Sequence, residues 1–243
     1  MKFLALIPAR YASSRFPGKP LADIAGKPMI QHVYERASQV FDACWVATDD
    51  GRISDAVEFF GGRVVMTSPD HRSGTDRCRE ALDTIERRTG ERFDVVVNIQ
   101  GDEPFVAAEQ LQQLATCFNL PDTDIATSVK PFGKGEDIFN PYSPKVVISR
   151  EGYALYFSRS VVPYLRNEPA EEWQAKHPFL KHLGIYAYRS KVLREIADLK
   201  PGVLETAESL EQLRWLENGF RIRVAVTDRE SLAVDTPDDL ARV

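Results

Sequence analysis

Short apolar runs alternate with longer segments of helical periodicity in the first hundred residues of the chain. The apolar runs are residues 2–7, 43–48, 63–66 and 94–99. Between them, apolar residues recur three and four positions apart, as on one face of an α-helix. Strands that alternate with such helices form βαβ units, so we expect an α/β fold with a mainly parallel sheet covered by helices on both faces. Ligands bind such sheets at the carboxyl ends of the strands.

The pattern changes after about residue 124. Shorter β-type runs then follow, separated by joints rich in proline and glycine, at 124–130, 145–149, 152–157 and 182–188. We interpret this region as an inserted antiparallel β subdomain. The division expected is therefore residues 1–130 with 200–243 as an α/β domain and residues 131–199 as the insertion.

Three further segments carry structural expectations. Residues 166–178 are polar and mixed in charge, which is typical of a surface loop. Pro28 is expected at the first position of a helix, and Gly90 is placed to end another. A strand is expected at 222–226, and Pro237 is expected to begin a last helix.

The composition excludes several classes of protein. The apolar runs are far shorter than the roughly 18 residues of a membrane span, and Pro8 and Arg10 interrupt the first run too early for a signal peptide. The net charge of -5 disfavours broad binding to nucleic-acid polymers. Three widely spaced cysteines favour neither a disulfide framework nor a zinc site. We expect a cytoplasmic protein with no membrane or nucleic-acid partner.

A cationic segment follows the first predicted strand. Arg10, Arg15 and Lys19 lie there among hydroxyl-bearing and small residues. Guanidinium groups and backbone N–H groups at the end of a strand can bind phosphate, so the segment favours a polyphosphate ligand. A solvated basic loop is the alternative. The segment has neither the G-x-x-x-x-G-K-[ST] nor the G-x-G-x-x-G pattern, which disfavours a Walker ATPase and a dinucleotide-binding dehydrogenase.

Two aspartates are candidate metal ligands. Asp102 follows the most apolar predicted strand, where Gly101 allows a tight turn. A carboxylate there, opposite a cationic loop, could share a divalent ion with phosphate oxygens, although an ordinary solvated strand exit is the alternative. Asp235 lies just outside the helix expected at Pro237 and is a candidate second ligand.

Six motifs, in order along nearly the whole chain, resemble the 3-deoxy-manno-octulosonate (Kdo) cytidylyltransferases. They are Pro8-Ala9-Arg10 with Ser14-x-x-Pro17-Gly18-Lys19-Pro20-Leu21, Gln100-Gly101-Asp102-Glu103-Pro104, Gly152-Tyr153-Ala154-Leu155-Tyr156-Phe157-Ser158-Arg159, His182-Leu183-Gly184-Ile185-Tyr186, Leu210-Glu211-Gln212-Leu213-Arg214 and Val234-Asp235-Thr236-Pro237. The related acylneuraminate enzymes have a Gly-Ser-Lys loop where this chain has Ser13-Ser14-Arg15. The difference favours the octulosonate branch.

The resemblance implies a Rossmann-like nucleotidyltransferase fold and a Mg²⁺-dependent transfer of CMP from CTP to Kdo, a 2-keto-3-deoxy sugar acid, for lipopolysaccharide biosynthesis. The sugar hydroxyl would attack the α-phosphorus in line and expel pyrophosphate. Residues 1–130 with 200–243 would bind the nucleotide. Residues 131–199 would bind the sugar and join two copies into a homodimer.

The resemblance also implies roles for individual residues. The residues implied to bind CTP are Pro8, Ala9, Arg10, Ser14, Arg15, Lys19, Arg72, Ser73, Gly74, Arg77 and Gln100. Those implied in catalysis are Arg10, Arg15, Lys19 and Asp102, and the metal ligands would be Asp102 and Asp235. The sugar acid would lie among Arg159, His182, Tyr186, Glu211 and Gln212, with Arg159 as partner of its carboxylate. The chain departs from the family at Asp76, where the family has glutamate, and over 164–180.

Other interpretations stay open at this point. Arg159 could be a structural ion-pair partner, and His182 could be a packed side chain or a general base. The substrate could be an amino-octulosonate or a sialic acid. A non-catalytic nucleotide-binding module is a different class of function, and the two separated acids count against it, because a pure binder does not need a metal at a reactive phosphate.

Overall fold

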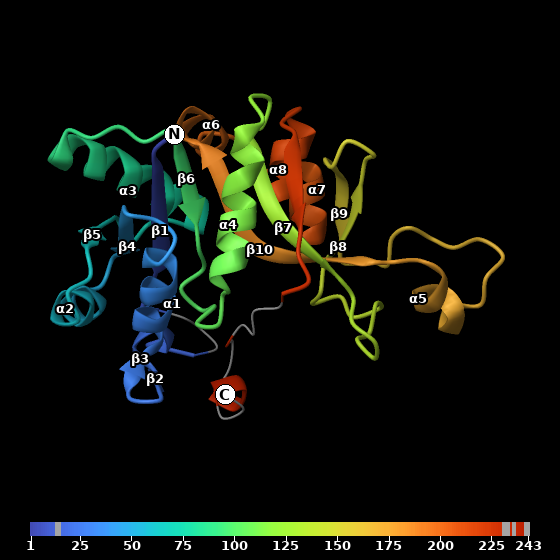
Figure 1. Cartoon of the computed structure of the whole chain (residues 1–243), viewed down its shortest axis with the longest axis horizontal. Coiled ribbons are helices and arrows are strands. Elements are labelled where there is room, and N and C mark those ends of the chain that lie inside the picture. Colours follow the sequence, from blue (N-terminus) through green and yellow to red (C-terminus); the bar gives the residue numbers. More distant parts are fainter. Residues whose placement is uncertain (13–15, 230–233, 235–236, 241–243) are drawn as a thin grey trace. The chain divides into compact units, whose positions relative to one another are not determined.

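The computed structural model describes residues 1–12, 16–229, 234 and 237–240 (Figure 1). The chain divides into two compact units, each described here by itself. The first comprises Met1–Gln112, Ile185–Ala197 and Glu230–Val243, and the second comprises Gln113–Gly184 and Asp198–Arg229. These boundaries follow packing. The functional division at residues 131–199 concerns ligand binding and association, and it stays a prediction.

A mainly parallel sheet forms the centre of the first unit. β1 (Phe3–Ala9) pairs in parallel with β4 (Cys44–Thr48) on one side and β6 (Val95–Asn98) on the other. β5 (Val64–Met66) extends it in parallel beyond β4. The last residues of β10 (Leu180–Arg189) run antiparallel to β6. The predicted parallel sheet is confirmed, with one antiparallel edge.

Helices cover both faces of this sheet. Leu4, Ala5, Leu6 and Ile7 of β1 have no solvent exposure. Successive strand residues point to opposite faces, so both faces must be covered. α1 (Met29–Ser38) and α3 (Gly74–Thr89) contact β1, and α2 (Gly51–Phe59) contacts β4 and β5. The expected two-sided α/β arrangement is confirmed.

The observed end of one helix agrees with the end expected from the sequence, at Gly90, whereas the observed start of another differs, at Pro28. Gly90 ends α3 with a φ of 73°, a left-handed conformation that favours glycine. Pro28 is not helical: it pairs with Asp23 in a short two-stranded ribbon of β2 (Asp23–Ile24) and β3 (Lys27–Pro28), and α1 begins at Met29. Its ψ of 144° is extended, because the ribbon fixes it there. The short helix η1 (Lys19–Leu21) precedes β2, and α9 (Pro237–Leu240) begins at Pro237 as expected.

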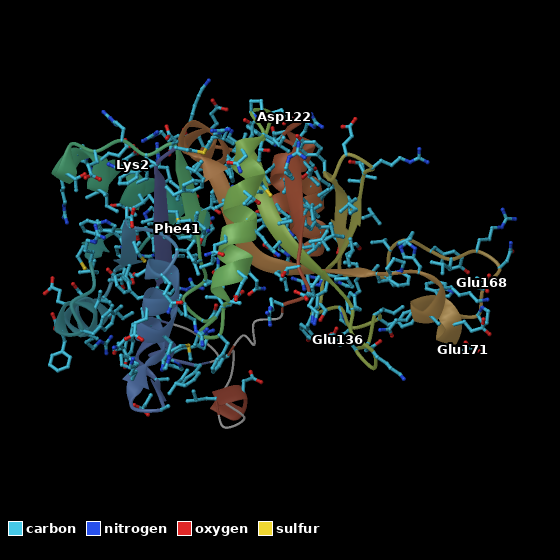
Figure 2. The ribbon with its side chains drawn as sticks, viewed as in Figure 1. Lys2, Phe41, Asp122, Glu136, Glu168 and Glu171 are labelled. Atoms are coloured by element: carbon cyan, nitrogen blue, oxygen red, sulfur yellow. The ribbon has the colours of Figure 1, made fainter. Side chains whose placement is uncertain are left out.

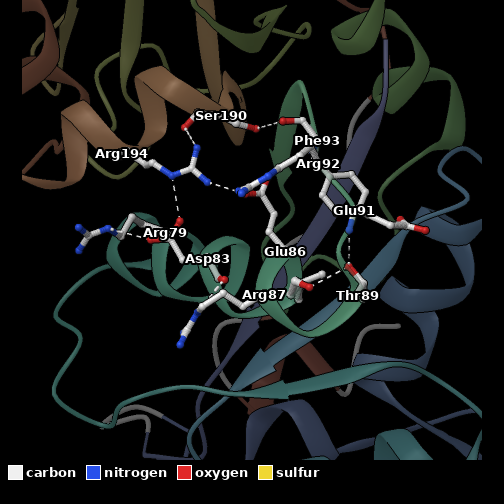
Figure 3. Close-up of polar contacts among 11 residues, drawn as sticks. Arg79, Asp83, Glu86, Arg87, Thr89, Glu91, Arg92, Phe93, Ser190 and Arg194 are labelled. Atoms are coloured by element: carbon white, nitrogen blue, oxygen red, sulfur yellow. Dashed lines mark hydrogen bonds and ion pairs between the residues drawn. The ribbon is translucent and has the colours of Figure 1, made fainter.

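A polar network joins α3 to α6 (Ser190–Ala197), a helix that the sequence analysis did not predict (Figure 3). The Arg194 guanidinium donates from Nε to Asp83 and from Nη2 to Glu86, each at 2.9 Å. Glu86 is only 5% exposed, and it also accepts the Phe93 backbone N–H at 3.2 Å. Buried charges need such partners, so this network fixes how α6 packs on α3.

The second unit combines parallel and antiparallel pairing. β7 (Ile125–Pro131) pairs in parallel with β11 (Ile222–Val226). β8 (Lys145–Ile148) is antiparallel to β9 (Ala154–Ser158) and to the start of β10. The run expected at 124–130 is a strand that also pairs with β10 on its other side. β11 returns beside β7 only after the long connection that contains α7 (Val203–Glu208) and α8 (Gln212–Glu217). α4 (Ala108–Thr116) and η2 (Cys117–Asn119) precede β7.

The segment 166–178, expected as a loop, contains two short helices. They are η3 (Ala170–Glu172) and α5 (Trp173–Lys176). Trp173 is 4% exposed and packs with Ile138 and Phe179 in a small apolar cluster. Burial of Trp173 in this cluster thus gives the segment helical structure despite its polar composition. Nearby, Glu136 forms ion pairs with Lys130 and Lys181 (Figure 2).

Within the residues that the structure describes, no helix has the length and apolar character needed to cross a membrane.

Candidate active site

A cavity of about 220 Å³ lies in the first unit, at the carboxyl ends of its parallel strands. Three segments far apart in the sequence converge there, one after β1, one between β5 and α3, and one after β6. The lining includes these residues expected to bind CTP or metal: Pro8, Ala9, Arg10, Lys19, Arg72, Ser73, Gly74, Arg77, Gln100 and Asp102. The structure adds Pro20, His71 and Gly101. The position of the cavity is the one that a parallel sheet dictates.

Three expected site residues, Ser14, Arg15 and Asp235, lie outside the described residues. The chain neighbour of Asp235 is described. Val234 is fully buried and donates its backbone N–H to the carbonyl oxygen of Asp102 at 3.0 Å. It packs with Ile24 and Met29, which lie at the base of the cationic segment. The late segment of the chain is thus bound to the turn that carries Asp102.

The cavity contains paired and unpaired cations. Lys19 Nζ lies 2.6 Å from Asp102 Oδ2, with side-chain exposures of 11% and 34%. Arg10 and Arg72 are exposed, and neither forms a hydrogen bond or ion pair with any other residue in the described ranges. Their planar guanidinium groups therefore present donors toward solvent, which suits bidentate binding of phosphate.

The N-terminus of α3 contributes to the same wall. Ser73 caps this helix, and its Oγ accepts the Asp76 N–H at 3.1 Å. Gly74 is the first helical residue and lines the cavity. The first N–H groups of a helix have no intrahelical partner and carry partial positive charge, so they favour an anion.

Gly101 allows a close approach of two strand ends. A Cβ atom at this position would lie 3.0 Å from the Pro8 carbonyl oxygen. That distance is tighter than most Cβ contacts, so a side chain here would move the turn after β6 a few tenths of an ångström away from the end of β1. The approach brings Asp102 to the loop that contains Lys19.

Arg77 has a different environment from the other cavity arginines. It is 3% exposed, and it donates to Thr67 Oγ1 at 2.6 Å and Asp49 Oδ2 at 3.1 Å. These partners follow β5 and β4, so the guanidinium joins two strand ends. The structure therefore supports a role for Arg77 in shaping the cavity wall.

His71 is the cavity residue that the sequence analysis missed. Its Nε2 forms a short hydrogen bond with Glu80 of α3. The histidine spacing gives no signal for it, because no second histidine or carboxylate lies in a motif with it. Its place after the strand at 63–66 was the available indication, since residues there are expected at the ligand edge.

The residues expected around the sugar acid lie mostly in the second unit. They are Arg159, His182, Glu211 and Gln212; Tyr186 lies in the first unit, where its ring stacks on Tyr188. The Arg159 guanidinium donates to three backbone carbonyls, those of Glu208 at 2.6 Å, Pro141 at 3.0 Å and Ser209 at 3.2 Å. These bonds fix its position and leave two of its five N–H groups for a ligand.

Gln212 is a buried side chain whose amide donor has no partner. The residue is 4% exposed, and Nε2 forms no hydrogen bond in the described part of the protein. It is the first residue of α8, three positions after Ser209, which accepts a hydrogen bond from Arg159. A buried amide without a partner is costly, so a ligand oxygen would complete it.

His182 is enclosed by neighbouring side chains. Its Nε2 lies 3.2 Å from Thr127 Oγ1, and its ring meets Phe157 edge-on at 5.1 Å. Burial lowers the pKa of His182 to about 3. The imidazole is therefore neutral and a very weak base at neutral pH, which favours a packing or binding role over general-base catalysis.

We expect His182→Gln to reduce the loss of stability in acid. The unfolded chain binds a proton at this histidine near its usual pKa of about 6.5, whereas the folded chain resists protonation down to about 3. Stability is thus fully present above the unfolded pKa and falls as the pH drops below it, by up to about 1.4 kcal/mol per pH unit. Because the residue retains some solvent exposure, this slope is an upper bound.

Denaturant unfolding at several pH values between the two pKa values checks this. The variant should show a shallower decrease in the free energy of unfolding than the unsubstituted protein. His177→Gln is the control, because His177 lies in the same unit and its ring also meets a phenylalanine edge-on. Identical acid slopes for the His182 variant and the unsubstituted protein would contradict the expectation.

The described residues contain no cluster of three or more His, Cys, Asp or Glu side chains that could enclose a metal by themselves. Asp102 nevertheless presents a partly exposed carboxylate at the cavity. Mg²⁺ is commonly bound by one or two carboxylates together with substrate phosphates, so these residues fit a metal that arrives with a nucleotide.

A parallel sheet that presents cations, a helix N-terminus and a carboxylate at its carboxyl edge defines a nucleotide-binding α/β protein. The family model described as Cytidylyltransferase matches residues 4–223. The chain belongs to the cytidylyltransferase family, and its fold is the Rossmann-like nucleotidyltransferase fold.

Relatives of the chain carry a more specific name. One from Parabacteroides distasonis is 58% identical over 100% of this chain and 96% of its own length, and one from Thermodesulfovibrio yellowstonii is 47% identical over 99% and 96%. Both are named 3-deoxy-manno-octulosonate cytidylyltransferase. A solved structure of CMP:2-keto-3-deoxy-manno-octonic acid synthetase complexed with CTP has a TM-score of 0.90, 45% identity, and coverage of 100% of this chain and 96% of that one. A cytidylyltransferase from Leptospira borgpetersenii, at 16% identity and a TM-score of 0.63, shares the fold.

Proposed function

We propose that this protein transfers CMP from CTP to the anomeric hydroxyl of 3-deoxy-manno-octulosonate, giving CMP-Kdo and pyrophosphate. One observation carries the proposal. The cavity brings the cationic segment after β1, the N-terminus of α3 and the Asp102 carboxylate together in a chain whose relatives are named for this activity over nearly their whole length.

The cavity residues bind and orient CTP. Arg10, Arg15 and Lys19 neutralise the phosphates, the Ser14 hydroxyl helps to hold them, and the N–H groups at the start of α3 add partial positive charge. Gln100 lies near the cytidine, the segment from Arg72 to Gly74 extends from the cytidine to the phosphates, and Pro8 and Ala9 complete the wall. Holding the triphosphate in one geometry and neutralising its charge accounts for most of the catalysis, because phosphoryl transfer needs no covalent intermediate with the protein.

Asp102 and Asp235 are the proposed ligands of Mg²⁺. Asp102 forms an ion pair with Lys19, so one carboxylate can face both a protein cation and a metal. When bound, the metal would lower the charge on the reacting phosphate. Lys19, Arg10 and Arg15 would stabilise the negative charge that the leaving pyrophosphate acquires.

The sugar acid binds to residues of the second unit. The two remaining N–H groups of Arg159 suit the carboxylate of the sugar acid, and the buried Nε2 of Gln212 suits one of its hydroxyl oxygens. Glu211 precedes Gln212 and lies 4.0 Å from Arg214, which anchors it at the start of α8. His182, neutral because it is buried, contributes hydrogen bonding without charge.

Release of pyrophosphate, measured with each nucleoside triphosphate and sugar acid, tests the proposed function. We expect turnover with CTP, Kdo and Mg²⁺, and none when any of the three is omitted. Preference for a sialic acid or an amino-octulosonate would change the assigned substrate. CTP binding without turnover would indicate a non-catalytic module, and no turnover with CTP and Kdo would end the main proposal.

We expect Gln212→Leu to weaken sugar binding without loss of stability. The leucine removes a buried donor that no residue in the described ranges accepts from, so the free energy of unfolding should stay the same or rise by up to about 1 kcal/mol. The KM for Kdo should rise by roughly three- to ten-fold, and the KM for CTP should not change. Steady-state kinetics with each substrate varied and denaturant unfolding measure both effects.

Gln110→Leu is the matched control, because Gln110 is equally buried but accepts the Ala107 N–H at 2.9 Å. It should lose stability and keep both KM values. An unchanged KM for Kdo in the Gln212 variant, with lower stability, would give Gln212 a structural role.

We also propose that the protein is a homodimer joined through residues 131–199. β9 pairs with β8 alone among the described strands, and it exposes 62% of Leu155. An open strand edge with an apolar residue favours association. Light scattering would give a mass near twice the 27.4 kDa of one chain, and a monomeric mass would contradict this proposal.

A further inference from the structure

We propose that His71 binds the phosphates of CTP and takes up a proton when the nucleotide binds. The inference rests on the proposed function, and it adds a residue and a proton linkage to the same site. It is supported by the place of His71 in the cavity, by its contact with Glu80, and by a second ring nitrogen that forms no hydrogen bond with any described residue.

His71 is held in the cavity wall by its contact with Glu80. It lies between β5 and α3 beside Arg72, and its side chain is 20% exposed. Nε2 pairs with Glu80 Oε2, and Glu80 Oε2 also accepts the Ser68 backbone N–H at 2.9 Å. The carboxylate is therefore fixed, and it fixes the orientation of the ring.

The contact with Glu80 determines what the other ring nitrogen can do. Burial raises the pKa of Glu80, but hydrogen bonds from the Ser68 N–H and from His71 outweigh it and hold the pKa below its usual value. Glu80 is thus ionised near neutral pH, and an ionised carboxylate only accepts, so Nε2 carries a hydrogen. Nδ1 has no hydrogen-bond partner among the described residues. It is an acceptor in the neutral ring and a donor in the imidazolium.

The balance of charge around His71 shifts from positive towards negative when a triphosphate enters the cavity. Glu80 on α3 and Asp70 in the adjacent loop favour the imidazolium. The cations that line the cavity, namely Arg10, Lys19, Arg72 and Arg77, oppose it, and Asp102 is already paired with Lys19. CTP brings about four negative charges into this cavity and so offsets the cations. Phosphate oxygens accept only, so a hydrogen bond from Nδ1 requires the protonated ring. Binding and protonation are therefore linked.

Calorimetry of Mg²⁺–CTP binding to the full chain tests the linkage. Titrations near pH 7 in buffers of different ionisation enthalpy give the number of protons taken up on binding. We expect a larger uptake for the unsubstituted protein than for His71→Gln, by up to one proton. CTP affinity should fall by about ten-fold in the variant, the usual effect of losing a hydrogen bond to a charged group.

Two further variants keep the test decisive. Glu80→Gln retains the ring but removes the negative charge that favours the imidazolium, so it should also reduce proton uptake, and it serves if His71→Gln does not fold. His32→Gln is the matched control: His32 is also half-buried and hydrogen-bonded, to the Ile24 carbonyl oxygen at 2.8 Å, but it does not line the cavity. It should leave uptake and affinity unchanged.

Two results would overturn the inference. The first is equal proton uptake in the unsubstituted protein and both cavity variants. The second is unchanged uptake with lost preference for CTP over UTP, which would mean that the neutral ring accepts a hydrogen bond from the cytosine amino group. A failure of the unsubstituted protein to bind CTP would instead contradict the proposed function.

Discussion

Asp102→Asn should reduce turnover with CTP and Kdo by about a thousand-fold or more while the protein remains folded. The amide has nearly the same shape as the carboxylate but lacks its charge, so it is a poor ligand for Mg²⁺. The substitution also removes a negative charge that lies 2.6 Å from Lys19 Nζ, and so reduces the repulsion between this part of the cavity and a phosphate. Turnover should therefore fall, whereas the affinity for CTP in the absence of Mg²⁺ should not.

Measurements at different metal concentrations separate the two effects. In the absence of Mg²⁺, CTP should bind the variant at least as tightly as it binds the unsubstituted protein. Added Mg²⁺ should strengthen binding to the unsubstituted protein alone. Asp55→Asn, an exposed acid on α2 that does not line the cavity, is a control that should keep its turnover. If the Asp102 variant retains its activity, Asp102 is not a metal ligand.

Arg10→Gln should reduce kcat/KM for CTP by about a hundred-fold without any loss of stability. The stability expectation follows from the contacts, since Arg10 is exposed and no described residue bonds to it. The kinetic expectation follows from the loss of a charged, bidentate donor at the phosphates. Steady-state kinetics and thermal unfolding provide the two readouts.

Salt dependence strengthens this test. If Arg10 neutralises phosphate charge, the KM of the unsubstituted protein should rise with ionic strength, and the KM of the variant should rise less. Arg221→Gln is the control, because Arg221 stacks on Tyr153 in the second unit and faces no cavity residue. An Arg10 variant with unchanged kinetics would support the solvated-loop alternative for this segment.

The sequence predicted the sheet edge better than the individual contacts on it. Periodicity is local, so the strands of the first unit and the segments that follow them could be read directly. Parallel pairing then required those segments to meet, and Arg10, Ser73 and Asp102 do line one cavity. What periodicity cannot show is which cation pairs with which acid. The contacts of Lys19 with Asp102, and of Arg77 with Asp49, cross long sequence separations and depend on packing.

The missed features have the same cause. His71 lies in a segment expected at the ligand edge, but its orientation is set by Glu80, which is nine residues further along the chain in the second turn of α3. β7 has the composition of an antiparallel strand, and only the return of β11 beside it makes the pair parallel. The polar segment around Trp173 forms short helices because Trp173 is buried against Ile138 and Phe179. No local sequence rule indicates this packing.

The hydrogen bond from Val234 to the Asp102 carbonyl oxygen has a consequence for biosynthesis on the ribosome. The cationic segment, the start of α3 and the turn after β6 all emerge within the first 102 residues of the nascent chain. The cavity that these segments line is nevertheless complete only after Val234 is translated, more than a hundred codons later. Val234 then binds the turn and buries Ile24 and Met29. A chain still being translated should therefore be unable to hold its nucleotide, however early its first strands pair.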